Sequence, residues 1–141
     1  MTVNLERRVA VAAVTRGITK VWAVNDPAGT RPQVLMPEPD DQRNNHYRQV
    51  QRNHHNETDV FDREYFEEIS RLLSPAKEIL LVGHGKGKAN EMLKLVQYLE
   101  RYHADTARKI VGAVDTNLES LTDAEILDFS KDWFAEPIHA R

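Results

Sequence analysis

Apolar residues in the first third of the chain fall in short runs separated by turn residues. Residues 9–14 are small and almost all apolar, which is typical of a strand buried on both faces. A turn at Arg16-Gly17 leads into residues 18–24, whose partial alternation predicts a hairpin partner for the first strand. A second turn over residues 25–29 precedes a short apolar run at 33–36. This pattern predicts that the chain begins with a β-meander.

The second half alternates between helical and strand-like patterns. One helix is predicted to begin at Asp59 and end at Ser74, and another to begin at Asn90. Residues 78–83 form the clearest buried strand, and residues 109–114 are predicted to form a further buried strand. The inward stripes of the two helices are expected to be Phe61, Tyr65, Ile69 and Leu72, then Met92, Leu95, Val96, Leu99 and Tyr102.

The last predicted helix begins with a capping signal. The sequence Thr122-Asp123-Ala124-Glu125 has the spacing of a capping box, in which the Thr hydroxyl and the Glu carboxylate accept from each other's backbone amides. Trp133, like Trp22 in the meander, is most simply a core or interface residue. The apolar face of this helix is predicted to contain Ile126, Leu127, Phe129, Trp133 and Phe134.

Together these elements predict an α/β fold: an N-terminal β-meander followed by α-β-α-β-α, with helices packed on a mixed central sheet. The crossovers imply parallel strands in the second half. A length of 141 residues fits a single domain over residues 1–141. Residues 38–56 depart from the pattern because they have almost no aliphatic side chains, and they are interpreted as a polar mobile loop.

Composition and charge narrow the possible functions. The net charge is −3, so the overall field does not draw the protein to nucleic acid or membranes, and such binding would need a local patch. The absence of cysteine excludes disulfides, thiolate catalysis and cysteine-based zinc sites. No apolar stretch is long enough to span a bilayer, and the N-terminus lacks a signal-peptide pattern. A cytoplasmic location is therefore expected.

The first candidate binding site follows the clearest strand. The segment Gly83-His84-Gly85-Lys86-Gly87-Lys88 joins this strand to a helix, so its backbone amides and two lysines are placed to face an anion or an RNA phosphate. It does not match the P-loop, because Lys88 is followed by Ala89, and its glycine spacing is wrong for a dinucleotide-binding turn. The alternative is a flexible turn with solvated lysines.

The second candidate lies in the polar loop. Arg43, Arg48 and Arg52 accompany Tyr47, which offers charge and one stacking surface for single-stranded RNA. The alternative is a solvated loop, since Asp40 and Asp41 lie close in sequence. The two candidates would form one basic face if the fold brings them together.

The order of these elements resembles the middle domain of the eukaryotic-type release factor and Pelota superfamily. The matching features are the meander over 9–36, the polar loop over 40–56, the helix from Asp59 and the strand ending Ile79-Leu80-Leu81-Val82-Gly83-His84-Gly85. A final strand ending in Val114-Asp115 and the sequence Leu121-Thr122-Asp123-Ala124-Glu125 make the chain more similar to small bacterial members.

One departure from this family bears directly on activity. The resemblance implies that release factors carry Gly-Gly-Gln in the loop before the long helix, where it positions water for peptide release. The equivalent residues 41–49 contain no glycine here, so the backbone freedom that glycine gives is missing. Peptide release is therefore not expected.

Three enzymatic or metal-binding alternatives were weighed. His54-His55 with Glu57, Asp59 and Asp62 could suggest a metal site, although helix-dipole stabilisation already explains the carboxylates. A two-metal nuclease needs converging carboxylates, and the strand ends supply only Asp115, with Asp26 in a distant turn. There is no G-x-S-x-G elbow for serine catalysis, and the candidate serines lie on helices or at their edges: Ser70, Ser74, Ser120 and Ser130.

The sequence therefore favours a non-catalytic binding module that contacts RNA or the translation machinery, including the ribosome. It is expected to need no cofactor and no metal and to have no membrane contact. The alternative is a small anion- or nucleotide-binding protein or hydrolase that uses Gly83–Lys88. A homo-oligomer formed through an edge strand of the meander is a third hypothesis.

Overall fold

The computed structural model describes residues 3–15, 17–37, 60–84 and 91–136, with side chains of the first long helix described from Arg63 onward. Within these residues, five strands form one mixed sheet in the order β3-β2-β1-β4-β5. The strands are β1 (Val9–Val14), β2 (Thr19–Ala23), β3 (Gln33–Leu35), β4 (Glu78–Gly83) and β5 (Ile110–Asp115). The predicted α/β fold is confirmed.

The meander and the crossovers pair as the sequence predicted. Strand β2 is antiparallel to both β1 and β3, whereas β4 is parallel to both β1 and β5. The parallel pairs require crossovers, which the intervening helices supply. Strand β1 thus lies at the centre of the sheet, and its residues from Ala10 to Val14 are buried.

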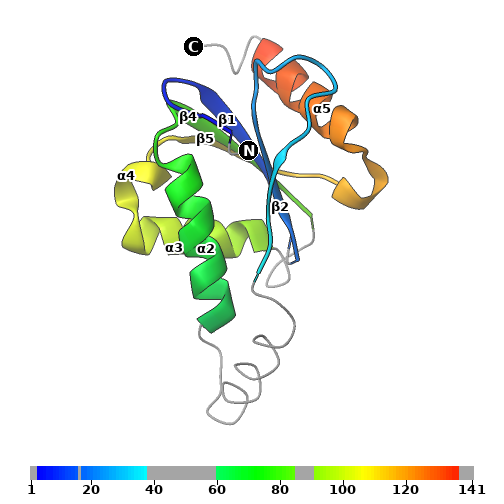
Figure 1. Cartoon of the computed structure of the whole chain (residues 1–141). Coiled ribbons are helices and arrows are strands. Elements are labelled where there is room, and N and C mark those ends of the chain that lie inside the picture. The colour runs from blue at the N-terminus through cyan, green and yellow to red at the C-terminus, as the bar shows by residue number, and fades with distance from the viewer. Residues whose placement is uncertain (1–2, 16, 38–59, 85–90, 137–141) are drawn as a thin grey trace.

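Helices cover both faces of the sheet. Helices α2 (Val60–Leu73) and α3 (Glu91–Tyr102) pack on one face, and α5 (Asp123–Ala135) packs on the other (Figure 1). A short helix α4 (Ala104–Ala107) and a 3₁₀ turn η2 (Leu118–Ser120) flank β5. The result is a three-layer arrangement with the sheet in the middle.

Alternation along the central strands builds a separate core on each face. Ala10, Ala12 and Val14 of β1 face the α2/α3 core, whereas Val11 and Ala13 face the α5 core. Strand β4 divides in the same way between its odd and even residues. Trp22 is fully buried on the α5 side, as predicted, and its indole Nε1 donates to Thr30 O at 2.9 Å.

The buried residues of α2 and α3 confirm most of the predicted inward faces and differ from the prediction in two respects. Tyr65, Ile69 and Leu99 are buried as expected, but Phe66 and Leu73 are buried as well, because α2 rests on the sheet and also contacts α3. Tyr102 was predicted to face inward and is instead 51% exposed. It is the last residue of α3, and the end of this helix extends beyond the core.

The capping box of α5 is present as predicted. Glu125 N donates to Thr122 Oγ1 at 3.1 Å, and Thr122 N donates to Glu125 Oε1 at 2.8 Å. The apolar face of α5 then packs on the sheet, with Ile126 and Leu127 buried and its aromatic residues half-buried. Trp133 covers the strand at Gly112, where a Cβ atom would lie only 2.7 Å from the indole ring.

The prediction that residues 109–114 form a buried strand was wrong in its burial. Strand β5 begins at Ile110 and is the edge strand next to β4, so none of its side chains is fully buried and Ala113 is exposed. At the other edge, β3 is only three residues long, with Val34 and Met36 exposed. The hypothesis of pairing through this edge stays a prediction.

Candidate functional site

One row of paired residues marks the end of the sheet where the candidate segments begin. Leu35 pairs with Thr19, Thr19 with Val14, Val14 with Gly83, and Gly83 with Asp115. The row therefore crosses all five strands. It joins the carboxyl ends of β1, β3, β4 and β5, and we call it the carboxyl edge. Ligands of open α/β sheets usually bind at this end of the parallel strands.

The carboxyl edge contains the ends of the two strands that precede the candidate segments in sequence. Residues Arg43, Arg48 and Arg52 lie outside the described residues, and so do Gly85, Lys86, Gly87 and Lys88. The polar loop follows β3, which ends at Leu35, and the glycine-rich segment follows β4, which ends at Gly83. Three strand spacings separate Leu35 from Gly83, which amounts to about 14 Å.

Helix α2 is fastened to the same edge by a buried polar cluster. The Tyr65 hydroxyl lies 2.6 Å from Thr19 Oγ1 and donates to Thr15 O at 3.0 Å. Because the Tyr65 hydroxyl donates its proton to Thr15 O, it accepts the hydrogen bond from the Thr19 hydroxyl. Tyr65 is 2% exposed and Thr19 is fully buried, so their two hydroxyls are shielded from water. The first half of α2, which follows the polar loop in sequence, is therefore held at the carboxyl edge.

His84 and Gly83 are the two predicted site residues that the structure describes. Gly83 is the buried last residue of β4, and its carbonyl accepts from Thr116 N at 2.8 Å. His84 is half-buried, and its Nδ1 lies 3.2 Å from Thr116 O. These contacts join the end of β4 to the residue after β5. In this arrangement His84 Nδ1 bonds to the backbone, so the ring has a positioning role at the edge.

A pocket of about 250 Å³ opens at the carboxyl edge on the α5 side. Most of its lining is aliphatic or small, with Lys20 and Glu119 as its charged members. Lys20 Nζ donates to Asp123 Oδ1 at 2.7 Å, so its charge is partly balanced. Sequence reasoning missed this pocket, because it forms only where η2 folds back over β1 and β2. The lining residues are Ala13, Thr15, Ile18, Lys20, Leu118, Glu119, Leu121 and Ile126.

The carboxylates considered for a nuclease lie at opposite ends of the sheet. Asp115 is exposed at the carboxyl edge, whereas Asp26 follows β2 at the other end. Asp26 accepts from Arg8 at 2.7 Å and from the Ala23 amide at 3.1 Å, so it has a structural role in its turn. The two carboxylates cannot share a metal pair, whose ions lie about 3.5–4 Å apart.

The described residues test the serine hypothesis but not the proposed histidine metal site. Among the described residues, no group of three or more His, Asp or Glu side chains could hold a metal ion. The side chains of His54, His55, Glu57, Asp59 and Asp62 lie outside the described residues, so that hypothesis is untested. The buried hydroxyls of Ser70 and Ser130 donate to helix carbonyls at 2.7 and 2.9 Å, which gives them a local role in their helices.

A second polar cluster joins α2 to the end of α3, away from the carboxyl edge. Glu67 Oε2 accepts from the Tyr98 hydroxyl at 2.5 Å and lies 2.9 Å from His103 Nε2. The Tyr98 hydrogen bond, followed by the His103 contact, lowers the pKa of Glu67 below its ordinary value. Burial, followed by the hydrogen bond to Glu67, raises the pKa of Tyr98 to about 12. Glu67 is more than 30 positions away in sequence from both of its partners, so no local sequence pattern predicted this cluster.

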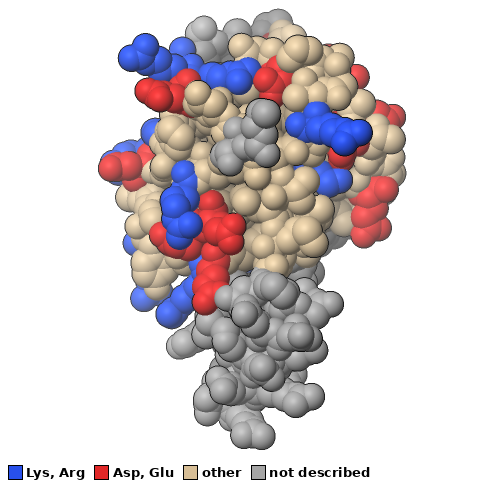
Figure 2. All heavy atoms as spheres, viewed as in Figure 1, with Lys and Arg blue, Asp and Glu red and all other residues tan. Residues whose placement is uncertain are grey.

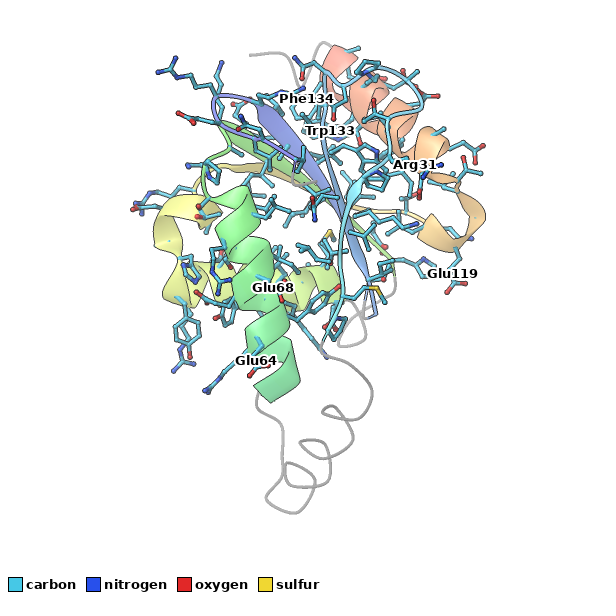
Figure 3. All side chains as sticks on the ribbon, in the orientation of Figure 1. Arg31, Glu64, Glu68, Glu119, Trp133 and Phe134 are labelled. Carbon is cyan, nitrogen blue, oxygen red and sulfur yellow. The ribbon has the colours of Figure 1, made fainter. Side chains whose placement is uncertain are left out.

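The outward surface of α2 carries acidic side chains beside the exposed Arg63 and Arg71. Figure 2 shows acidic side chains gathered over this helix, and Figure 3 shows Glu64 and Glu68 on its outer side. Both side chains are exposed.

Within the described part of the chain, no helix is long and apolar enough to cross a membrane.

Comparison with known proteins supports the fold. No protein-family model matches the sequence, and no curated protein matches it significantly. Among solved structures, the chain is similar to Pelota from Archaeoglobus fulgidus, with a TM-score of 0.53 and 12% sequence identity. The match covers 90% of this chain but only 31% of the Pelota chain, so this protein spans less than a third of that relative. At this identity the similarity is one of architecture: the chain has a Pelota-like α/β fold.

Proposed function

We propose that this protein is a non-catalytic binding module that contacts RNA, as part of the translation machinery, through the carboxyl edge of its sheet. The observation that carries the proposal is the row of paired residues from Leu35 to Asp115. The two basic segments follow β3 and β4 in sequence, and both of these strands end in this row of a Pelota-like fold. The resemblance to release-factor middle domains, noted from the sequence, supports the link to translation.

Charge along the sequence supports the choice of this edge. Residues 42–56 contain three arginines and no Asp or Glu, and the segment after Gly83 adds Lys86 and Lys88. Cations in this arrangement can neutralise RNA phosphates even though the protein is acidic overall. The outer side of α2 exposes Glu64 and Glu68 together with Arg63 and Arg71, so it offers RNA no excess of positive charge (Figure 2). RNA is therefore expected to approach the end of the sheet and to avoid the outer side of α2.

The proposal excludes peptide release as the activity. Residues 41–49 lack the Gly-Gly-Gln tripeptide that the family resemblance would require. The two carboxylates considered for hydrolysis are held at opposite ends of the sheet.

The test compares two edge variants with a control that removes two positive charges, as many as the variant of Lys86 and Lys88. Ribosome co-sedimentation and RNA filter binding are measured at low and physiological salt for the wild type, Lys86→Ala/Lys88→Ala and Arg43→Ala/Arg48→Ala/Arg52→Ala. The control is Arg7→Ala/Lys77→Ala, which removes two exposed charges that precede β1 and β4 at the opposite end of the sheet. Each lost phosphate contact should reduce the logarithmic salt slope by about one.

The outcomes separate the hypotheses. Weaker binding by the edge variants, with the control unchanged, supports the proposal. Absence of binding at both salt concentrations, or equal affinity of the edge variants and the control, refutes it. Binding of inorganic phosphate or ATP without RNA or ribosome binding would instead favour the anion-binding alternative at Gly83–Lys88.

A further inference from the structure

The end of the fold opposite the carboxyl edge has a second, polar cleft. It has a volume of about 510 Å³, within the range of small-ligand sites, and it lies between the last residues of α2 and the α3–α4 junction. Its lining offers hydroxyl, carboxylate, imidazole and ammonium groups and one half-exposed aromatic ring. The lining residues are Ser74, Tyr102, His103, Ala104, Asp105, Thr106 and Lys109.

Tyr102 is the unusual member of this lining. Its side chain is 51% exposed, whereas Met92, Leu95 and Leu99 of the same helix are buried. The Tyr98 ring supports it at a centroid distance of 4.9 Å, and the Arg101 guanidinium lies 5.4 Å from its ring centre. The guanidinium lies over the ring, so a nucleobase would stack on the part of Tyr102 that stays exposed, and aromatic rings and arginine planes are both surfaces on which proteins stack unpaired bases.

The polar groups around Tyr102 are held in place by their own partners. Glu67 fixes the His103 ring through Nε2, and Lys109 Nζ donates to Ser74 O at 2.6 Å. Asp105 forms an ion pair with Arg108, and both side chains are exposed beside the cleft. The cleft thus presents both hydrogen-bond donors and acceptors, which suits the mixed edge of a nucleobase. The exposed guanidinium groups of Arg101 and Arg108 could meet the attached phosphates.

We propose that this cleft binds a nucleobase, stacked on Tyr102 and recognised along its edge by the groups at Asp105, Thr106 and Lys109. The base belongs either to a free nucleotide or to single-stranded RNA. This inference is independent of the proposed function, because the cleft lies at the opposite end of the sheet from the carboxyl edge and uses none of its residues.

The experiment follows backbone amide resonances of the isotope-labelled protein during titration with AMP at millimolar concentration and, separately, with a short oligo(A) RNA. Chemical-shift changes are expected at residues 102–109. Tyr102→Ala should weaken binding about five-fold or more, whereas Tyr102→Phe should retain it, because stacking needs the ring and not the hydroxyl. Leu93→Ala is the matched control, since Leu93 is 42% exposed on the same helix but does not line the cleft.

The two probes identify the source of the base. Comparable affinity for AMP and for the oligonucleotide supports a free nucleotide, and binding of the oligonucleotide alone supports RNA. Absence of shifts at residues 102–109 with both probes, or equal affinity of Tyr102→Ala and the wild type, overturns the inference. Lys86→Ala/Lys88→Ala should leave these shifts unchanged. If that variant abolishes them, the base binds at the carboxyl edge and the inference fails.

Discussion

Replacing Tyr65 with phenylalanine tests the polar cluster that fastens α2 to the carboxyl edge. The change removes one oxygen and keeps the ring, so packing on Phe66 and the sheet is preserved. Thr19 Oγ1 then loses its acceptor at 2.6 Å, and Thr15 O loses its donor at 3.0 Å. A buried polar group left without a partner costs about 1–3 kcal/mol.

Most of this cost comes from Thr19. Its side chain is fully buried, whereas Thr15 is half-buried and its carbonyl can bond to water. We therefore expect Tyr65→Phe to lower the free energy of unfolding by about 2 kcal/mol, near the middle of the range for one unsatisfied buried group. At this chain length the melting temperature should fall by about 4–8 °C.

Urea denaturation measures the loss, and a double-mutant cycle locates it. Thr19→Val should be less costly in the Tyr65→Phe background than in the wild type, because the hydroxyl it removes has already lost its acceptor. A coupling of about 1 kcal/mol is expected. Tyr102→Phe is the control for loss of an exposed tyrosine hydroxyl and should change stability by less than about 0.5 kcal/mol. A Tyr65→Phe effect no larger than this control, or strictly additive single variants, would refute the reasoning.

Two further predictions concern the α5 core and the Glu67 cluster. Gly112→Ala should destabilise the protein by about 1–2 kcal/mol in urea, because its Cβ would lie 2.7 Å from Trp133 Cζ2 and 3.1 Å from Leu80 Cδ1. Gly17→Ala, with nothing within 4 Å, is its control, and equal losses would contradict the packing argument. The pKa of Glu67 is lowered in the folded state, so its contribution is present above the unfolded pKa and lost as pH falls through the folded value. Glu67→Gln should therefore flatten the acid limb of stability against pH, and an unchanged limb would contradict this assignment.

The sequence could predict the elements whose signal is local. Continuous apolar runs identified β1 and β4, and the spacing of Thr122 and Glu125 identified the start of α5. The partial exposure of β5 could not be predicted from its apolar run. An apolar run predicts a strand, but its place at the centre or the edge depends on which side of β4 the chain crosses to.

The candidate site was only partly predictable for a related reason. The sequence pointed to Gly83 and the two basic segments, and the pairing of Leu35, Thr19, Val14 and Gly83 shows that the strands preceding these segments end at one edge. The Glu67 cluster and the two pockets depend on contacts between distant elements. No short pattern encodes such contacts, because each residue reads locally as an ordinary surface position.

The central position of β1 has a consequence for folding during synthesis. Of the five strands, β1 is synthesised before the others and can pair with β2 after a few more residues, but its parallel partner β4 begins only at Glu78. Until that partner emerges, the nascent chain can form the antiparallel meander but exposes one side of the future central strand. Long-range parallel pairing is slow to form and leaves apolar edges open to other chains. The interval between synthesis of β1 and β4 is therefore the period in which this protein is most exposed to aggregation.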